Sequence, residues 1–338
     1  MKICIVGAGS IGGYVGVKLA QAGEDVTLIA RNANLEAIRS RGMRLTMADG
    51  VEHVVRHINA SASLAEAGPQ DLVILGMKAN QLAAVIKDLP YLLHDNTVIV
   101  PMQNGIPFWY FQRHGGEFED RIVHSVDPDG HIMRAIDPSR ILGCVVYPAC
   151  ELAAPGWVRH IEGDRFPLGE LDGRESERVL AISAMFANAG LKAPVLNNIR
   201  SEIWLKLWGN LTFNPISALT HSTLVDICQF PLSRALAASM MHEAEAVATR
   251  LGISFRVTLE KRIAGAEKVG KHKTSMLQDV ESGRDPEIDA LVGAVIELGK
   301  ITAVPTPHIE TVYALMKLLS VRINDDKLAV RAQPMAAA

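Results

Sequence analysis

The chain has 338 residues, of which 49% are hydrophobic and 21% are charged, and its formal net charge is -3. This composition supplies a sizeable apolar core, excludes a largely disordered chain, and gives no general attraction to nucleic acid or to an anionic membrane. No apolar run approaches the roughly 20 residues that a membrane span needs, and at roughly 150 residues per domain the length predicts about two domains.

The N-terminal segment predicts a strand, a tight turn, a helix and a second strand. Residues 2–6 are a short apolar run with β-branched side chains, as in a strand that is buried on both faces. A helical pattern follows over 11–22, Gly23 is a typical helix stop, and 25–30 form the second strand. Together these pieces have the ordinary length of a βαβ unit.

Two more apolar strands are predicted over 71–78 and 96–106, with a helix over 81–93 between them. This alternation of strands and helices indicates a parallel, doubly wound sheet. From 141 to 170 the pattern changes to short strands that are punctuated by glycine and proline, and an amphipathic helix is predicted next, over 177–190.

The remaining pattern divides the chain into two domains. A short strand over 192–197 closes the first part, and from residue 198 onward nearly every segment has helical periodicity. The predicted fold class is therefore α/β, with a Rossmann-type doubly wound parallel sheet over 1–197 and an all-helical domain over 198–338. The final residues, 329–338, are expected to fray.

A glycine-rich loop joins the first strand to the first helix. Gly7, Gly9 and Gly12 have the spacing G-x-G-x-x-G. Gly7 allows the tight turn, Gly9 lets the backbone approach a pyrophosphate, and Gly12 lets the helix pack closely. The strand–turn–helix context makes a dinucleotide site a stronger interpretation than a turn without a ligand. The predicted cofactor loop consists of Gly7, Ala8, Gly9, Ser10, Ile11 and Gly12.

The end of the second strand indicates which dinucleotide binds. A protein that binds NAD usually has Asp or Glu there, to accept a hydrogen bond from the ribose. This chain has Arg31 in the stretch "LIARN". Because a guanidinium suits a 2′-phosphate, the sequence favours NADP (NADPH) over NAD. The alternative is a solvated arginine at the end of a strand.

Three polar residues interrupt the apolar stretch "IWLKLWGNLTFNPISALT". Lys206, Asn210 and Asn214 follow one another at intervals of four, which places them on one face of a helix. Burying such groups costs several kcal/mol unless each finds a partner. They could serve a substrate site. Alternatively, the lysine could extend to solvent and the amides could join helices or mark a kink before Pro215.

Five separated motifs give the chain a resemblance to the ketopantoate reductases over nearly its whole length. These motifs are "GAGSIGG", "MKANQ", "QNG", "WLKLWGNLTFNP" and "SMLQDVESGRDPEID", in this order. The resemblance implies an NADPH-dependent enzyme that reduces 2-dehydropantoate (ketopantoate) to pantoate, with the polar stripe facing a cleft between the domains.

The resemblance also assigns roles to individual residues. It implies that Lys78 helps to hold the cofactor and that Asn104 lies where nicotinamide and substrate meet. The implied catalytic residues are Lys206, as the proton donor, and Glu287. The implied substrate-binding residues are Asn104, Lys206, Asn210, Asn214 and Ser275. Glu287 could instead stabilise a helix start, and Asn104 could be part of a common Asn-Gly turn.

One segment departs from the family pattern. The link after Asn104 is longer and more aromatic than is typical, with Phe108, Trp109, Tyr110 and Phe111 in succession. These side chains could be packing residues, or they could line a larger apolar pocket. The second interpretation favours a related reductase of a bulkier 2-oxo acid. A non-enzymatic NADP-binding regulator is a third alternative, although it would need neither Lys206 nor Glu287.

The cysteines and the charge pattern limit the location and the partners. Cys4, Cys144, Cys150 and Cys228 form no CxxC pair and have no metal-ligand spacing. We therefore expect reduced, mostly buried thiols, no metal site and a cytoplasmic location. The expected partner is a small-molecule 2-oxo acid, with neither nucleic acid nor membrane, and the apolar helical domain allows a homodimer.

Overall fold

The computed structural model describes residues 1–333, and the described chain forms two compact units. Unit 1 comprises residues 1–104, 108–122 and 129–202, and unit 2 comprises 105–107, 123–128 and the chain from 203 onward. The units change at Glu202, within a helix, whereas the boundary after residue 197 stays a prediction. Residues 334–338 of the tail that was expected to fray lie outside the described residues.

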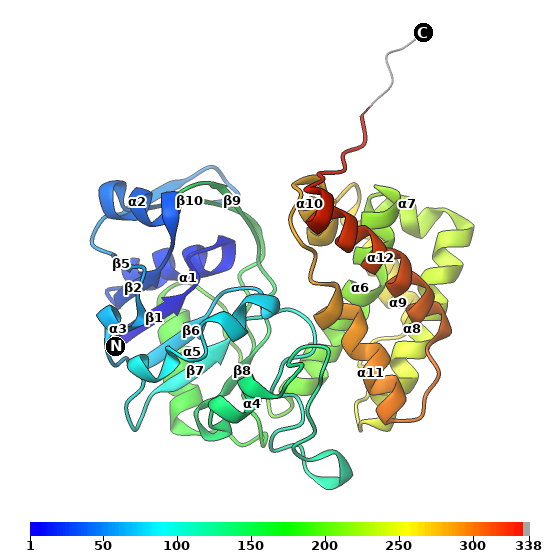
Figure 1. Cartoon of the computed structure of the whole chain (residues 1–338), viewed down its shortest axis with the longest axis horizontal. Coiled ribbons are helices and arrows are strands. Elements are labelled where there is room, and N and C mark those ends of the chain that lie inside the picture. The colour runs from blue at the N-terminus through cyan, green and yellow to red at the C-terminus, as the bar shows by residue number, and fades with distance from the viewer. Residues whose placement is uncertain (334–338) are drawn as a thin grey trace. The chain divides into compact units, whose positions relative to one another are not determined.

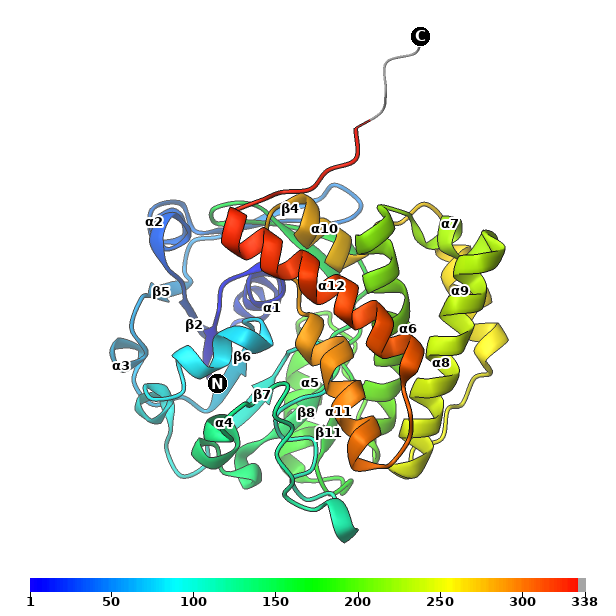
Figure 2. The same cartoon turned by 45° about the vertical axis from the view of Figure 1, so that its right-hand side comes forward.

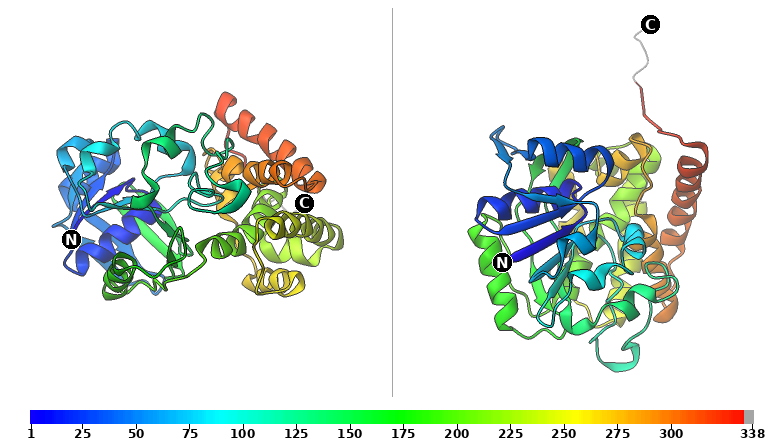
Figure 3. Two further views of the ribbon diagram at one scale, coloured as in Figure 1. Left: turned by 90° about the horizontal axis from the view of Figure 1, so that it is seen from below. Right: turned by 60° about the vertical axis from the view of Figure 1, so that its left-hand side comes forward.

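A five-stranded parallel sheet forms the centre of unit 1, in the order β5-β2-β1-β6-β7 (Figure 1). Its strands are β1 (Lys2–Val6), β2 (Asp25–Ile29), β5 (Asn59–Ser61), β6 (Leu72–Leu75) and β7 (Val98–Pro101). Val6 pairs with Ile29 on one side and with Leu75 on the other, so the carboxyl ends of three strands are level. The blue strands run side by side in the right-hand view of Figure 3. The predicted parallel sheet is confirmed.

Helix α1 (Ser10–Gln21) lies between this sheet and a second one. The second sheet has the order β4-β3-β10-β9 and consists of β3 (Met43–Thr46), β4 (Glu52–Val55), β9 (Ala149–Ala154) and β10 (Trp157–Glu162). A Cβ at Gly16 would lie 2.8 Å from Leu28, and a Cβ at Gly13 would lie 2.4 Å from Met43. Two glycines therefore let α1 pack tightly against both sheets at once.

Shorter elements complete unit 1. The strands β8 (Leu142–Cys144) and β11 (Leu168–Glu170) pair antiparallel. The helices are α2 (Asn32–Arg41), α3 (Leu64–Ala67), α4 (His131–Ala135) and α5 (Glu177–Asn188). Short 3₁₀ turns lie at η1 (Ala79–Ala84), η2 (Leu89–Leu92), η3 (Gly116–Phe118) and η4 (Pro138–Arg140).

Two predicted elements of unit 1 are wrong. The expected helix over 81–93 is replaced by η1, a turn and η2. The turn between them lies at residues 85–88, and Pro90 lies in the first turn of η2, where its missing amide hydrogen is tolerated. The expected strand over 192–197 makes only isolated bridges, Arg165 with Lys192 and Leu168 with Val195.

The regular elements of unit 2 are all helical in its described residues, as the sequence predicts, and loops connect them. Its helices are α6 (Ile199–Thr220, beginning in unit 1), α7 (Leu224–Gln229), α8 (Pro231–Arg250), α9 (Leu259–Val269), α10 (Ser275–Glu281), the π-helical turn η5 (Asp289–Gly293), α11 (Ala294–Ile301) and α12 (Pro307–Asp326). Helix α12 packs along α8 and η5 (Figure 2). Within the tail that was expected to fray, the Val330 amide donates to the Val280 carbonyl at 3.2 Å.

Candidate active site

Two positions of the glycine loop accept only glycine, one because of its backbone conformation and the other because a side chain has no space. Gly7 has a φ of +108°, and a Cβ there would lie 2.9 Å from the amide nitrogen of Met77. A Cβ at Gly12 would lie 2.0 Å from the Gly7 carbonyl oxygen. At Gly9, in contrast, no atom beyond Gly9 and its two chain neighbours lies within 4 Å of the position that a Cβ would take. The backbone at Gly9 is therefore open to close approach by a ligand.

The loop is held from the end of β2 and leads into a helix start. The Ile29 carbonyl accepts hydrogen bonds from the amides of Gly7 at 3.2 Å and Ala8 at 3.0 Å. Helix α1 then begins at Ser10, with no acidic residue in its first turn. The first amides of a helix have no intrahelical acceptor and lie at the positive end of the helix dipole. This local structure suits a phosphate anion.

Arg31 lies just beyond the strand that holds the loop. It is exposed, has extended backbone angles (φ -136°, ψ 158°), and immediately precedes α2. Its position after β2 matches the place where the sequence predicts a 2′-phosphate site. An exposed guanidinium can bind a phosphate through two parallel hydrogen bonds.

Lys78 and Asn104 follow the neighbouring strands β6 and β7, and both are half-buried. Between these strands, the side-chain amide of Gln103 donates to the carbonyls of Leu75 at 2.7 Å and Met77 at 3.1 Å. Gln103 thus fixes the turn that leads to Lys78. The sequence interpretation missed this role, because the motif "QNG" gave no reason to weigh the glutamine.

The polar stripe lies on a continuous helix. Lys206 and Asn210 are half-buried on α6, and Asn214 is 6% exposed. Another face of α6 packs into unit 2, where the Trp208 ring stacks on Phe255 at 4.1 Å between centroids. The Trp208 indole also donates to the Met241 carbonyl at 2.8 Å. Since 3.6 residues make one turn, each member of the stripe lies about one turn after the last.

Ser275 begins α10, and Glu287 lies at the end of the loop that follows this helix. Thr274 caps this helix by accepting from the Leu277 amide at 3.3 Å, and Ser275 is the first helical residue and is exposed. Glu287 is half-buried and immediately precedes the helical segment that contains η5. Single π-helical turns are rare in proteins and frequently lie at functional sites.

The aromatic stretch is buried. Phe108, Trp109, Tyr110 and Phe111 are each at most 4% exposed, and all four belong to unit 1. Tyr110 and Phe111 meet edge to face with ring centroids 5.0 Å apart. The packing interpretation of these residues is confirmed.

Comparisons with known proteins give the family. Residues 3–173 match the model described as ketopantoate reductase PanE/ApbA, and residues 198–320 match the model of its C-terminal part. The chain belongs to the ketopantoate reductase family.

Individual members of the family resemble the chain over nearly its whole length. A 2-dehydropantoate 2-reductase of Mesorhizobium japonicum is 52% identical over 95% of this chain and 98% of its own length. A crystal structure from Ralstonia solanacearum MolK2, assigned as a ketopantoate reductase, has a TM-score of 0.91 and 41% identity, and the match covers 96% of this chain and 98% of that one. A 2-dehydropantoate 2-reductase structure from Geobacter metallireducens has a TM-score of 0.82 and 27% identity, and the match covers 94% of this chain and 99% of that one.

The local structure of this family member fits its cofactor class. Ketopantoate reductases are NAD(P)-dependent oxidoreductases. The space beside Gly9 and the start of α1 are features that suit the pyrophosphate of a dinucleotide. Among residues 1–333, no group of three His, Cys, Asp or Glu side chains is placed to hold a metal ion. No helix in the same range is long and apolar enough to cross a bilayer.

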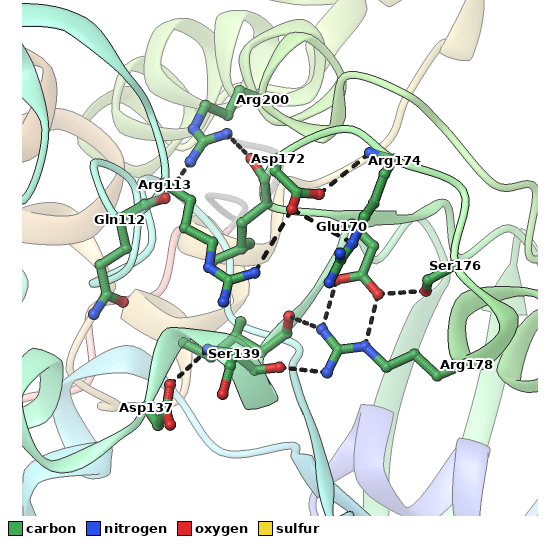
Figure 4. A network of polar contacts seen from close by, with 12 residues as sticks. Gln112, Arg113, Asp137, Ser139, Glu170, Asp172, Arg174, Ser176, Arg178 and Arg200 are labelled. Atoms are coloured by element: carbon green, nitrogen blue, oxygen red, sulfur yellow. Dashed lines mark hydrogen bonds and ion pairs between the residues drawn. The ribbon is translucent and has the colours of Figure 1, made fainter.

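A network of arginines and carboxylates, of which Glu170 and Arg200 are buried, supports unit 1 of this reductase (Figure 4). Glu170, 1% exposed, accepts two hydrogen bonds from Arg178, at 2.5 and 2.6 Å, and one from Ser176. Arg200 donates to the carbonyls of Tyr110, Gln112 and Leu171 at 2.6 to 2.8 Å. Burial lowers the pKa of the Arg200 guanidinium. The arginine thereby joins the first turn of α6 to the aromatic segment, a role that the sequence did not indicate.

Proposed function

We propose that this ketopantoate reductase catalyses the NADPH-dependent reduction of 2-dehydropantoate to pantoate. The observation that carries the proposal is the 52% identity to the Mesorhizobium japonicum 2-dehydropantoate 2-reductase over nearly the full length of both chains. The polar stripe of α6 supports it, because hydride transfer to a ketone needs a proton donor and groups that orient the substrate.

The proposed cofactor is NADPH. The loop Gly7–Gly12 would hold the pyrophosphate, with its backbone open at Gly9. Arg31 would bind the 2′-phosphate, and Lys78 and Asn104 would complete the binding set after β6 and β7. The exposed cation at Arg31, where an acid would be expected for NAD, supports this preference.

The proposed mechanism assigns the proton to Lys206. NADPH, when bound, supplies the hydride that reduces the carbonyl carbon. Negative charge then develops on the carbonyl oxygen, and the ammonium of Lys206 stabilises this oxygen and donates a proton to it, which completes the alcohol. Lys206 is half-buried, so its charge would act in a medium of lower dielectric constant than water.

The remaining proposed site residues orient the substrate. Asn210 and Asn214 supply amide donors and acceptors from the same face of α6, and Asn104 supplies one from the end of β7. Ser275 would bind the substrate carboxylate through its hydroxyl. Glu287 would accept a hydrogen bond from the substrate hydroxyl. These five roles rest on the family motifs and on the positions of the residues on their elements.

The alternative of a bulkier 2-oxo acid is not favoured. It depended on Phe108 to Phe111 as the lining of a larger pocket, and these side chains are packed inside unit 1. The NADP-binding regulator is not favoured either, because the chain belongs to a family of reductases.

The test is the rate of NADPH oxidation by the purified protein with 2-dehydropantoate, beside bulkier 2-oxo acids such as phenylpyruvate. We expect turnover that is selective for 2-dehydropantoate. A higher kcat/KM with a bulkier acid would overturn the proposed substrate while retaining the reaction. Light scattering of the same sample tests the homodimer, which stays a prediction, as does the cytoplasmic location.

A further inference from the structure

Asn34 makes two hydrogen bonds that connect three parts of unit 1. Its side-chain nitrogen donates to the Ala8 carbonyl of the glycine loop at 2.8 Å. Its side-chain oxygen accepts from the amide of Gly156, in the turn between β9 and β10, at 2.7 Å. Asn34 is the third residue of α2, the helix that begins directly after Arg31. One half-buried amide therefore joins the loop, the helix and the hairpin turn.

The hairpin turn gives Asn34 a firm support. Gly156 has a φ of +71°, and a Cβ there would lie 3.0 Å from Ala37 on α2. Its carbonyl accepts from the Arg44 amide of β3 at 2.8 Å. The acceptor and donor groups of Gly156 are thus both engaged, and the oxygen of Asn34 is held in one orientation. This fixes the opposite end of the same planar amide, the nitrogen that contacts Ala8.

The contact with Ala8 determines the direction of the next amide. Ala8 is 3% exposed, and its own amide donates to Ile29 at 3.0 Å. The peptide bond from Ala8 to Gly9 is planar and trans, so its carbonyl and its N–H point in opposite directions. Because Asn34 holds the carbonyl, it also aims the Gly9 N–H away from itself. Gly9 is the position that has open space for a ligand.

We propose that Asn34 is a positioning residue that orients the Ala8–Gly9 peptide for the pyrophosphate of the cofactor. It does not need to touch the cofactor to do so. Arg31 and Asn34 then have separate roles in binding the dinucleotide. Arg31 contacts the 2′-phosphate, and Asn34 orients the loop that binds the pyrophosphate. This inference rests on the proposed cofactor site.

The test compares ligands that differ in these two phosphate groups. Asn34→Asp retains an acceptor for Gly156, loses the donor to Ala8 and places a negative charge beside its carbonyl. We expect the Kd values of NADPH and NADH to rise by the same factor, about 10-fold, which is the order expected for a hydrogen bond that becomes a repulsion. The Kd of adenosine 2′-monophosphate, which has no pyrophosphate, should stay unchanged.

Two further variants keep the result interpretable. Asn34→Ala removes both hydrogen bonds without adding charge. Because only the bond to Ala8 is made to the loop, it should weaken both dinucleotides about 5-fold, the order of one ordinary hydrogen bond. Asn96→Asp is the matched control, because Asn96 is exposed and precedes the amino end of β7, at the opposite edge of the parallel sheet. The thermal midpoint of each variant without ligand reports any loss of folding.

Two results would overturn the inference. Unchanged Kd values for both dinucleotides in Asn34→Asp and Asn34→Ala would show that the loop needs no support from Asn34. An equal loss for adenosine 2′-monophosphate would show general damage to α2. If the unmodified protein bound neither NADPH nor NADH, the proposed function itself would fail. Binding by the unmodified protein therefore tests the function, whereas the variants test the role of Asn34.

Discussion

Lys206 is the proposed proton donor, and a substitution can distinguish this role from effects on folding and on cofactor binding. We expect Lys206→Ala to lower kcat by at least ~100-fold, because general acid catalysis typically contributes a factor of this order or more. The Kd of NADPH should stay nearly constant, since the glycine loop and Arg31 belong to unit 1 and Lys206 to unit 2. Steady-state kinetics and a fluorescence titration measure the two quantities.

The matched control for this variant is Lys261→Ala, which removes an exposed lysine from α9 in the same unit. Its kcat should equal that of the unmodified protein. Retention of full turnover by Lys206→Ala would exclude Lys206 as the proton donor.

Arg31 sets the proposed preference between the two nicotinamide cofactors. Loss of a hydrogen-bonded ion pair costs about 1.5–3 kcal/mol, so we expect Arg31→Ala to weaken NADPH by roughly 10- to 100-fold. NADH lacks the 2′-phosphate and should be weakened far less. Arg41→Ala, at the exposed far end of the same helix, is the control. Equal weakening of both cofactors would remove the argument that Arg31 contacts the 2′-phosphate.

The cysteines have a reactivity that follows from burial. Burial raises the pKa of Cys4 to about 12 and that of Cys150 to about 12, and it also raises the pKa of Cys228. Because only the thiolate reacts, and the thiolate is the minor form below the pKa, these thiols should react very slowly with Ellman's reagent at pH 8. The reaction should become fast in denaturant. Rapid modification of Cys4 or Cys150 in the native protein, located by mass spectrometry, would contradict the burial argument.

At the scale of elements, helix α11 holds a short loop of unit 2 through one carboxylate. Glu297 accepts from the amides of His124 and Ser125, each at 2.7 Å, and from the Ser125 hydroxyl at 2.6 Å. Hydrogen bonds to a charged group are worth about 1.5–3 kcal/mol each. We expect Glu297→Ala to raise the hydrogen-exchange rates of the His124 and Ser125 amides by about 100-fold or more, as the local stability falls by about 3 kcal/mol.

The control for this prediction is Glu245→Ala on α8, whose side chain is 41% exposed and lies near His242. Exchange at His124 and Ser125 should be unaffected in that variant. If Glu297→Ala also left these amides protected, the loop would be held by its other packing contacts and the carboxylate would be dispensable.

Elements with a strong local signal could be predicted from the sequence, and elements without one could not. The strand–loop–helix at Gly7 to Gly12 and the helix of Lys206 were predictable because apolar periodicity and glycine spacing define them locally. The helix over 81–93 was predicted wrongly, since its apolar pattern did not reveal the two 3₁₀ turns and the turn at 85–88 between them. The π-helical turn η5 was not predicted at all, because one extra residue in a helical turn leaves no distinct apolar period.

At the scale of the whole molecule, the candidate site contains two kinds of residue. Some lie in short sequence motifs, and others support them through contacts between segments far apart in the sequence. The residues proposed to touch ligands follow short motifs, so the sequence could nominate them one by one. Their supports could not be found in this way. Asn34 reaches Gly156 over 122 positions, and Gln103 reaches Leu75 over 28. A single sequence carries no local sign of such a partner, since the contact exists only once the sheet has formed.

Arg200 is the support whose loss should affect the stability of unit 1 most. It joins α6 to Tyr110 and Gln112, which are 90 and 88 positions away in the chain, and also to Leu171. We expect Arg200→Met, which retains much of the side-chain volume, to destabilise the protein by about 3–5 kcal/mol, because three buried carbonyls lose their donor. Chemical denaturation measures the free energy of unfolding.

The control for Arg200→Met is Arg250→Met, which removes an exposed arginine at the end of α8. Its unfolding free energy should change by less than about 0.5 kcal/mol, as is usual for surface substitutions. Tryptophan fluorescence gives a second measurement, because the Arg200 guanidinium carbon lies 5.9 Å from the centroid of the Trp109 ring. If Arg200→Met unfolded at the same denaturant concentration as the control, water or a rearranged side chain would have to satisfy the three carbonyls. The aromatic segment would then be held by its burial alone rather than by the arginine.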